Sequence, residues 1–158
     1  ALILRDEGDR QPKALCLAYP WVTTNNENQP SLSSCANTFP LTADTMHFFN
    51  SQVFPNDLNK DHPWANPLHA QSLAGLPSTI IGTAGFDPIR DQGNTFASRL
   101  AESGNKVTHF CFESLTHSYL MFGRVSNEAE RACETLAVAL SESLNTPDWE
   151  DLSDQSAG

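Results

Sequence analysis

The segment STIIGTAGFDPIRDQGNTFASRLAESGNKVTHFCFESLTHSYLM, residues 78–121, decides the fold of this chain. Residues 78–84 form an apolar, β-branched run that predicts a strand. Pro88 suits a first helical position, and the apolar residues after it recur every three or four positions until Gly104 ends the helix. Residues 106–112 alternate between two faces and predict a second strand. Strand, crossover helix and strand in this order predict two parallel strands and therefore an α/β fold.

One acidic residue and one histidine follow these two strands. Asp87 comes directly after the first strand, and His117 comes after the second. The carboxyl ends of parallel strands meet at one edge of the sheet, which is where open α/β proteins bind ligands. Because neighbouring strands lie about 4.8 Å apart, a carboxylate and an imidazole at this edge can come within hydrogen-bonding distance. An Asp that orients a His is part of the acyl-transfer triad, so we expect Asp87 and His117 to be catalytic.

Asp87 also has a structural explanation. An Asp directly before a proline at a helix start is a common N-cap, and Pro88 favours the extended backbone that a cap needs. Taken alone, this position favours capping over catalysis; the histidine at the matching strand end is what favours catalysis. We expect Asp91, in the first helical turn, to complement the helix dipole, and Arg90 to form an ion pair at the surface.

The remaining histidines and the cysteines predict no metal site. No His or Cys pair has the spacing of metal ligands, and no other histidine follows a strand end that has a matching acid. These other histidines are His47, His62, His69 and His109. The four cysteines are Cys16, Cys35, Cys111 and Cys133. Cys16 and Cys111 in predicted strands and Cys133 on the apolar face of a predicted helix are expected to be small buried hydrophobic residues of a reducing compartment.

The acidic motif and the histidine turn also resemble those of a known family. The motif is DPIRD at residues 87–91, and the turn is LTHSY at residues 115–119. Both resemble the C-terminal half of the α/β-hydrolase fold, and most of all the bacterial hormone-sensitive-lipase-type carboxylesterases. That family carries its acid in a D-P-L-R-D-like motif after the seventh strand and its histidine in an L-I-H-G-F-like turn after the eighth. The resemblance implies that Asp87 and His117 belong to a Ser-His-Asp triad. Ser118 stands where the family usually has glycine, which affects the fine geometry of the turn.

The resemblance covers residues 1–144 and implies that they are the C-terminal portion of one α/β-hydrolase domain. Residues 15–21, LCLAYPW, resemble the sixth strand and its Tyr-Pro exit, and the continuous apolar run predicts a strand buried on both faces. Residues 41–54 resemble a cap helix, with Thr42 as a suitable N-cap. The phenylalanines of this helix either pack onto the rest of the domain or, as the resemblance implies, wall an acyl pocket.

Two parts of such an esterase do not occur in this sequence. Neither the G-x-S-x-G nucleophile elbow nor an H-G-G-G-like oxyanion loop is found in its 158 residues. Ser114 and Ser118 are the hydroxyls nearest to His117 in sequence, but no strand-to-helix elbow presents either of them. Residues 1–6 resemble the end of the helix that would follow the elbow. We therefore expect the nucleophile to lie upstream of Ala1, and this chain to be inactive without the missing N-terminal half.

Composition and charge exclude several kinds of partner. The formal charge of −10, from 9 basic and 19 acidic side chains, disfavours nucleic acid and anionic membrane surfaces, which would repel the chain. No apolar run approaches the length of a membrane span, no signal peptide is visible, and a cytoplasmic location is expected. A final helix is predicted over residues 127–144, capped by Asn127. The acidic tail, residues 145–158, is expected to be disordered.

The expected activity is hydrolysis of short or medium acyl esters without a metal or organic cofactor. One alternative is a small-ligand receptor on a non-catalytic hydrolase scaffold, as in the plant gibberellin receptors, which resemble this family but lose the triad histidine. An amidase or peptidase of the same fold is a third possibility. Retention of His117 beside Asp87 favours an enzyme. The resemblance and the exposed last strand also predict a homodimer.

Overall fold

Three parallel strands form one sheet in the computed structural model, which describes residues 1–25, 29–57, 60 and 62–146. The strands lie in the order β1-β2-β3, and β2 pairs with both neighbours. Their bounds are β1 Ala14–Ala18, β2 Ser78–Phe86 and β3 Val107–Thr116. The predicted pairing of the two strands of the central segment is therefore confirmed, and both strands run farther than the sequence pattern suggested.

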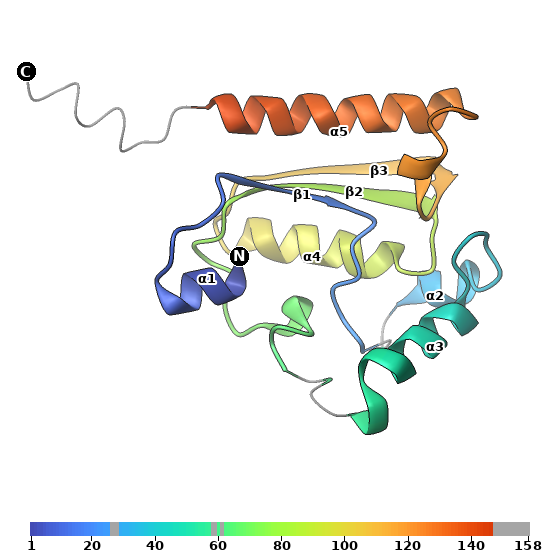
Figure 1. Ribbon diagram of the computed structural model, residues 1–158, viewed down its shortest axis with the longest axis horizontal. Helices are drawn as coiled ribbons and strands as arrows, with labels where there is room; N and C mark the ends of the chain where they lie inside the picture. Colours follow the sequence, from blue (N-terminus) through green and yellow to red (C-terminus); the bar gives the residue numbers. More distant parts are fainter. Residues whose placement is uncertain (26–28, 58–59, 61, 147–158) are drawn as a thin grey trace, which may run out of the picture.

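Helices cover both faces of this sheet (Figure 1). Helix α5 lies across one face, while α4 lies on the opposite face together with α2 and α3. The α-helices are α1 Leu2–Glu7, α2 Pro30–Ser34, α3 Ala43–Val53, α4 Arg90–Glu102 and α5 Asn127–Asn145. Short 3-10 turns lie at Pro55–Asp57, Pro67–His69 and Tyr119–Met121. The arrangement is the predicted α/β architecture with a parallel sheet between helical layers.

Strand β2 is buried on both faces because successive side chains point to opposite helical layers. Ile81 packs with Phe96 and Leu100 of α4, and Ile80 packs beneath α5. The full membership of the α4-side cluster is Val22, Leu68, Ala70, Leu73, Ile81, Phe96, Ala97 and Leu100. The α5-side cluster consists of Ile80, Ala84, Leu115, Tyr119, Ala129, Ala132, Leu136 and Ala139. A central strand between two such clusters explains the unbroken apolar run of its sequence.

Strand β1 differs from the prediction that it is buried on both faces. Its residues are only partly buried, and Cys16 is exposed. The strand lies at one end of the sheet and pairs only with β2 in the described part of the chain, so no second neighbour covers it. Cys111 and Cys133, which were expected to be buried like Cys16, are only half-buried, while Cys35 is buried.

The helix ends show one confirmed cap and one wrong prediction. Thr42 caps α3, as predicted, and its side chain accepts a hydrogen bond from the backbone N–H of Thr45. The cap of α5 is Ser126 and not Asn127, because Ser126 has the extended backbone of a cap and its Oγ accepts from the N–H of Ala129. Residue 145 is still helical, and residues 147–158, most of the predicted acidic tail, lie outside the described residues.

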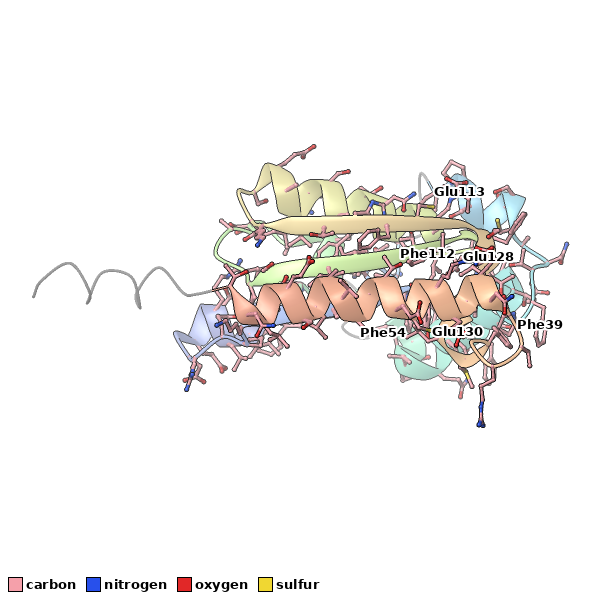
Figure 2. All side chains as sticks on the ribbon, turned by 90° about the horizontal axis from the view of Figure 1, so that it is seen from above. Phe39, Phe54, Phe112, Glu113, Glu128 and Glu130 are labelled. Carbon is pink, nitrogen blue, oxygen red and sulfur yellow. The ribbon has the colours of Figure 1, made fainter. Side chains whose placement is uncertain are left out.

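A bulge near the end of β3 sets the position of the histidine turn. Ala84 pairs with Phe112 and Phe86 pairs with Thr116, so β3 advances by four residues over the stretch in which β2 advances by two. The two strands approach so closely at Gly85 that a Cβ there would overlap the backbone of Glu113. A glycine in β2 therefore permits the bulge, and the bulge carries the chain into the turn that contains His117. Figure 2 shows Phe112 and Glu113 at the same end of the molecule as Glu128 and Glu130 in the first turn of α5.

Candidate active site

Asp87 lies at the carboxyl end of β2, as predicted, and is almost fully buried with 1% of its surface exposed. Its two carboxylate oxygens have different partners. Oδ1 accepts from the backbone N–H of Ile89 at 2.9 Å, and Oδ2 accepts from Nδ1 of His117 at 2.8 Å. One oxygen therefore holds the local turn and the other holds the imidazole, while the predicted N-cap position of α4 belongs to Ile89 and not to Asp87.

Helix α4 begins later than the sequence suggests. Residues 88 and 89 form a turn, and the helix starts at Arg90 with Ile89 as its N-cap. Because this turn lies between Asp87 and the first residue of α4, the carboxylate contacts both His117, after the neighbouring strand, and the backbone N–H of Ile89. A carboxylate at the N-cap position itself would instead be committed to the first helical amides.

His117 follows β3 in a turn with an unusual backbone. Its side chain is 17% exposed, and the next residue, Ser118, has φ 62° and ψ 22° in the left-handed region. That conformation is the one glycine adopts most easily, which accounts for the usual glycine at this position in the resembling family. A carboxylate only accepts hydrogen bonds, so the short contact places a proton on Nδ1. Nε2 is then left as the nitrogen that can receive a proton from a nucleophile.

The loop that carries Asp87 is held in place by α2. Ser31, which is fully buried, exchanges hydrogen bonds with Asp91: its N–H donates to Asp91 Oδ2 at 2.7 Å, and its Oγ accepts from the Asp91 N–H at 3.1 Å. The same hydroxyl donates to the carbonyl oxygen of Pro88 at 2.9 Å. Arg90 donates to the carbonyl of Gly85 at 2.9 Å and to Asp91 at 2.9 Å. The DPIRD motif is therefore mostly scaffold, and only its first residue faces His117.

Charge and burial shift the pKa values of three groups around the site. Desolvation tends to lower the pKa of Arg90, but the hydrogen bond and the negative charge of Asp91 outweigh it and raise that pKa. Burial raises the pKa of Tyr119 far above its ordinary value, and burial with the nearby Cys133 raises the pKa of Tyr19. Both tyrosines therefore stay neutral at physiological pH.

The other residues considered from the sequence do not join this pair. His109 lies within β3, where its Nε2 is 3.1 Å from Thr83 Oγ1, and the His62 ring accepts from the N–H of Trp64. Among the described residues, His117 is the only histidine bonded to a carboxylate. The described part of the chain also contains no group of three His, Cys, Asp or Glu side chains that could hold a metal. None of its helices is long and apolar enough to cross a membrane.

Replacing Ser31 by Ala is expected to lower the free energy of unfolding by about 2 kcal/mol. The substitution leaves the buried carbonyl of Pro88 without a donor and removes the acceptor of the Asp91 N–H. Chemical denaturation of both proteins measures the difference. Ser33→Ala, at an exposed position of the same helix, is the matched control and is expected to stay within about 0.5 kcal/mol of wild type. Equal effects of the two substitutions would show that Ser31 does not hold the loop.

Comparisons with known proteins agree with this fold. The sequence model of the α/β-hydrolase fold family matches residues 1–121. The carboxylic ester hydrolase LipN of Mycobacterium tuberculosis is 32% identical over 137 residues, which are 86% of this chain and 36% of LipN. A hyperthermophilic esterase from the archaeon Pyrobaculum calidifontis superimposes with a TM-score of 0.80 at 28% identity, over 87% of this chain and 46% of that structure.

A thermostable esterase from Pseudomonas putida ECU1011 gives a TM-score of 0.85 at 25% identity, over 92% of this chain and 47% of that structure. The chain thus spans less than half the length of each of these three relatives. Within that span, the backbone follows the fold of the two solved structures. The chain belongs to the α/β-hydrolase fold family, and the three relatives named here are called ester hydrolases or esterases.

Proposed function

We propose that this chain supplies the acid and the base of a serine carboxylesterase, in which the nucleophilic serine lies upstream of Ala1. The observation that carries the proposal is the 2.8 Å hydrogen bond between the buried Asp87 carboxylate and Nδ1 of His117 at the carboxyl edge of the sheet. The relatives named above are called ester hydrolases or esterases, which supports the reaction class.

The proposed reaction proceeds by acyl transfer. Nε2 of His117 takes the proton of the serine hydroxyl as its oxygen attacks the ester carbonyl, and the resulting imidazolium gives that proton to the leaving alcohol. Asp87 keeps the proton on Nδ1 and stabilises the imidazolium while it is charged. Water then attacks the acyl-enzyme in a second step with the same proton transfers in sequence. The oxyanion donors, like the serine, belong to the upstream half in this proposal.

The free side of β1 is where the upstream half would join the sheet. This edge pairs with no strand in the described part of the chain, and an apolar groove of about 340 Å³ runs beside it. Leu15, Leu17 and Trp21 line part of the groove together with α1. A parallel strand and its helix would cover these side chains and satisfy the unpaired backbone groups of β1. We refer to this chain joined to that half as the complete hydrolase.

Helix α3 is proposed to be the cap over the acyl group of the substrate. Met46 faces the core, whereas Phe48 and Phe49 are 59% and 44% exposed. The alternative, in which the phenylalanines pack onto the rest of the domain, fits Phe54, which is half-buried and meets Trp21 edge to face, but not Phe48 and Phe49. Short or medium acyl esters as substrates, a homodimer through β3 and α5, and a cytoplasmic location stay predictions. No observation here favours a receptor over an enzyme.

Expression of the chain alone and of the complete hydrolase tests the proposal. We expect the complete hydrolase to cleave p-nitrophenyl butyrate and to be labelled covalently by a fluorophosphonate, because both need an activated serine. The chain alone is expected to do neither. Failure of the complete hydrolase in both assays would contradict the esterase proposal. Rapid hydrolysis by the chain alone would instead contradict the assignment of the nucleophile to the upstream half.

A further inference from the structure

A single hydrogen bond does not fix the plane of an imidazole ring. The bond from His117 Nδ1 to Asp87 holds one nitrogen of the ring, but the ring can still rotate about its side-chain torsions and move Nε2. Proton transfer needs Nε2 to stay within hydrogen-bonding distance of the nucleophile. A second contact on the face of the ring is therefore needed to hold the productive orientation.

Tyr19 makes that second contact. Its ring centroid lies 4.6 Å from that of His117, with an angle of 56° between the ring planes. Tyr19 comes from the end of β1, a different strand from those that carry Asp87 and His117. The imidazole is thus bonded at Nδ1 to the residue after β2, and its ring contacts the ring of the residue after β1.

The backbone of Tyr19 is strained in the way that such a placement requires. Its φ is 40°, in the left-handed region that non-glycine residues rarely occupy, and its N–H donates to the carbonyl of Gly82 at 2.6 Å. A strained backbone of this kind costs about 1–3 kcal/mol and persists only where surrounding contacts impose it. Here the strain turns the chain directly after β1 and directs the aromatic ring toward the histidine.

The ring of Tyr119 packs against that of Tyr19. The two rings meet edge to face, with centroids 5.1 Å apart and an interplanar angle of 88°. Tyr119 is fully buried, and its hydroxyl occupies the space above Gly82 that a Cβ would fill. The ring of Phe112 also contacts that of Tyr119, with the two ring centroids 5.1 Å apart. Tyr19 therefore rests on a ring that cannot move without opening the core beneath α5.

We propose that Tyr19 is a positioning residue for His117, and that its ring, not its hydroxyl, holds the imidazole so that Nε2 faces the nucleophile. This inference rests on the proposed function, because it assigns Tyr19 a part in the same proton transfer. In that reaction the tyrosine exchanges no proton and touches no reacting atom. Its effect reaches the substrate only through His117.

Substitution of Tyr19 in the complete hydrolase tests the proposal. Tyr19→Leu removes the ring and is expected to lower kcat about 100-fold, since a misplacement of about 1 Å costs that much, with KM changed less than about twofold. Tyr19→Phe keeps the ring and is expected to retain kcat within about twofold. Phe110→Leu is the matched control: it removes an aromatic ring that packs against the same α5-side cluster but has no contact with His117, and it should leave kcat unchanged.

A spectroscopic measurement distinguishes a displaced His117 from a general loss of the folded structure. The proton on Nδ1 of a histidine bonded to a carboxylate gives a far-downfield ¹H NMR signal, which needs no substrate and no turnover. We expect this signal in wild type, Tyr19→Phe and Phe110→Leu, and its loss by exchange in Tyr19→Leu with secondary structure intact by circular dichroism. Persistence of both the signal and kcat in Tyr19→Leu would overturn the proposal. Absence of the signal from wild type would also overturn it, as would a loss of the signal in Tyr19→Phe equal to that in Tyr19→Leu. If wild type shows the signal but no hydrolysis, the proposed function fails while the NMR comparison still decides the role of Tyr19.

Discussion

Replacing Asp87 by Asn in the complete hydrolase is expected to lower kcat by about 10⁴-fold, with a far smaller change in KM. The aspartate accepts from Nδ1 of His117 and so keeps the proton on that nitrogen. An asparagine amide in the same place donates with its NH₂ group, and Nδ1 must then become the acceptor. The imidazole proton moves to Nε2, which can no longer take the proton of the nucleophile.

The substitution should leave the fold largely intact, which makes the loss of activity interpretable. The side-chain oxygen of Asn can still accept from the N–H of Ile89, the bond that holds the turn after β2. Asp91→Asn is the matched control, because Asp91 lies four residues away and contacts Ser31 and Arg90 but not His117. It is expected to retain kcat within about fivefold, the range of a partly exposed ion pair.

Steady-state kinetics and thermal unfolding of the two variants give the result. A kcat of Asp87→Asn within about tenfold of wild type would mean that the carboxylate does not set the tautomer of His117. The role of Asp87 would then be limited to its hydrogen bond with the N–H of Ile89. A large loss of kcat in both variants would indicate that the loop as a whole had moved. Only the first variant should lose activity if the pair works as proposed.

The sequence predicted the parts of this site that depend on local periodicity. Strand β2, helix α4 and strand β3 follow from an apolar run, a 3.6-residue pattern and an alternating run, and each is decided by residues close together in the chain. The approach of Asp87 to His117 followed from parallel topology, because the ends of neighbouring parallel strands meet at one edge. These features need no knowledge of long-range contacts.

The features that the sequence did not predict depend on contacts between distant segments. Ser31 lies 60 residues from Asp91, and no local pattern links the two. The left-handed backbone of Tyr19 is accompanied by a hydrogen bond to the carbonyl of Gly82 and a ring contact with Tyr119, so the motif Tyr-Pro alone does not reveal it. The α5 cap is a simpler error: Ser126 and Asn127 are both good caps, and the choice between them depends on where the preceding turn ends.

Replacing Gly85 by Ala is expected to lower the free energy of unfolding by about 3 kcal/mol and kcat of the complete hydrolase by about 100-fold. A Cβ at this position would overlap the carbonyl oxygen of Glu113, which belongs to the backbone and cannot swing away as a side chain would. Relief requires β3 to move away from β2 at the bulge. That movement is passed along Ser114, Leu115 and Thr116 to His117, which lies four residues after Glu113 and is bonded to Asp87.

Gly123→Ala is the matched control, because a Cβ there would come no closer than 3.7 Å to any atom, at Glu130. It is expected to change the free energy of unfolding by less than about 0.5 kcal/mol. Denaturation and kinetics of both variants separate two explanations of the glycine. If Gly85→Ala loses stability but keeps kcat, the bulge is only a packing feature of the sheet. If both fall, the close approach of β2 and β3 at Gly85 is what holds the histidine turn against the acid, and the geometry of the pair originates in the backbone rather than in the hydrogen bond between them.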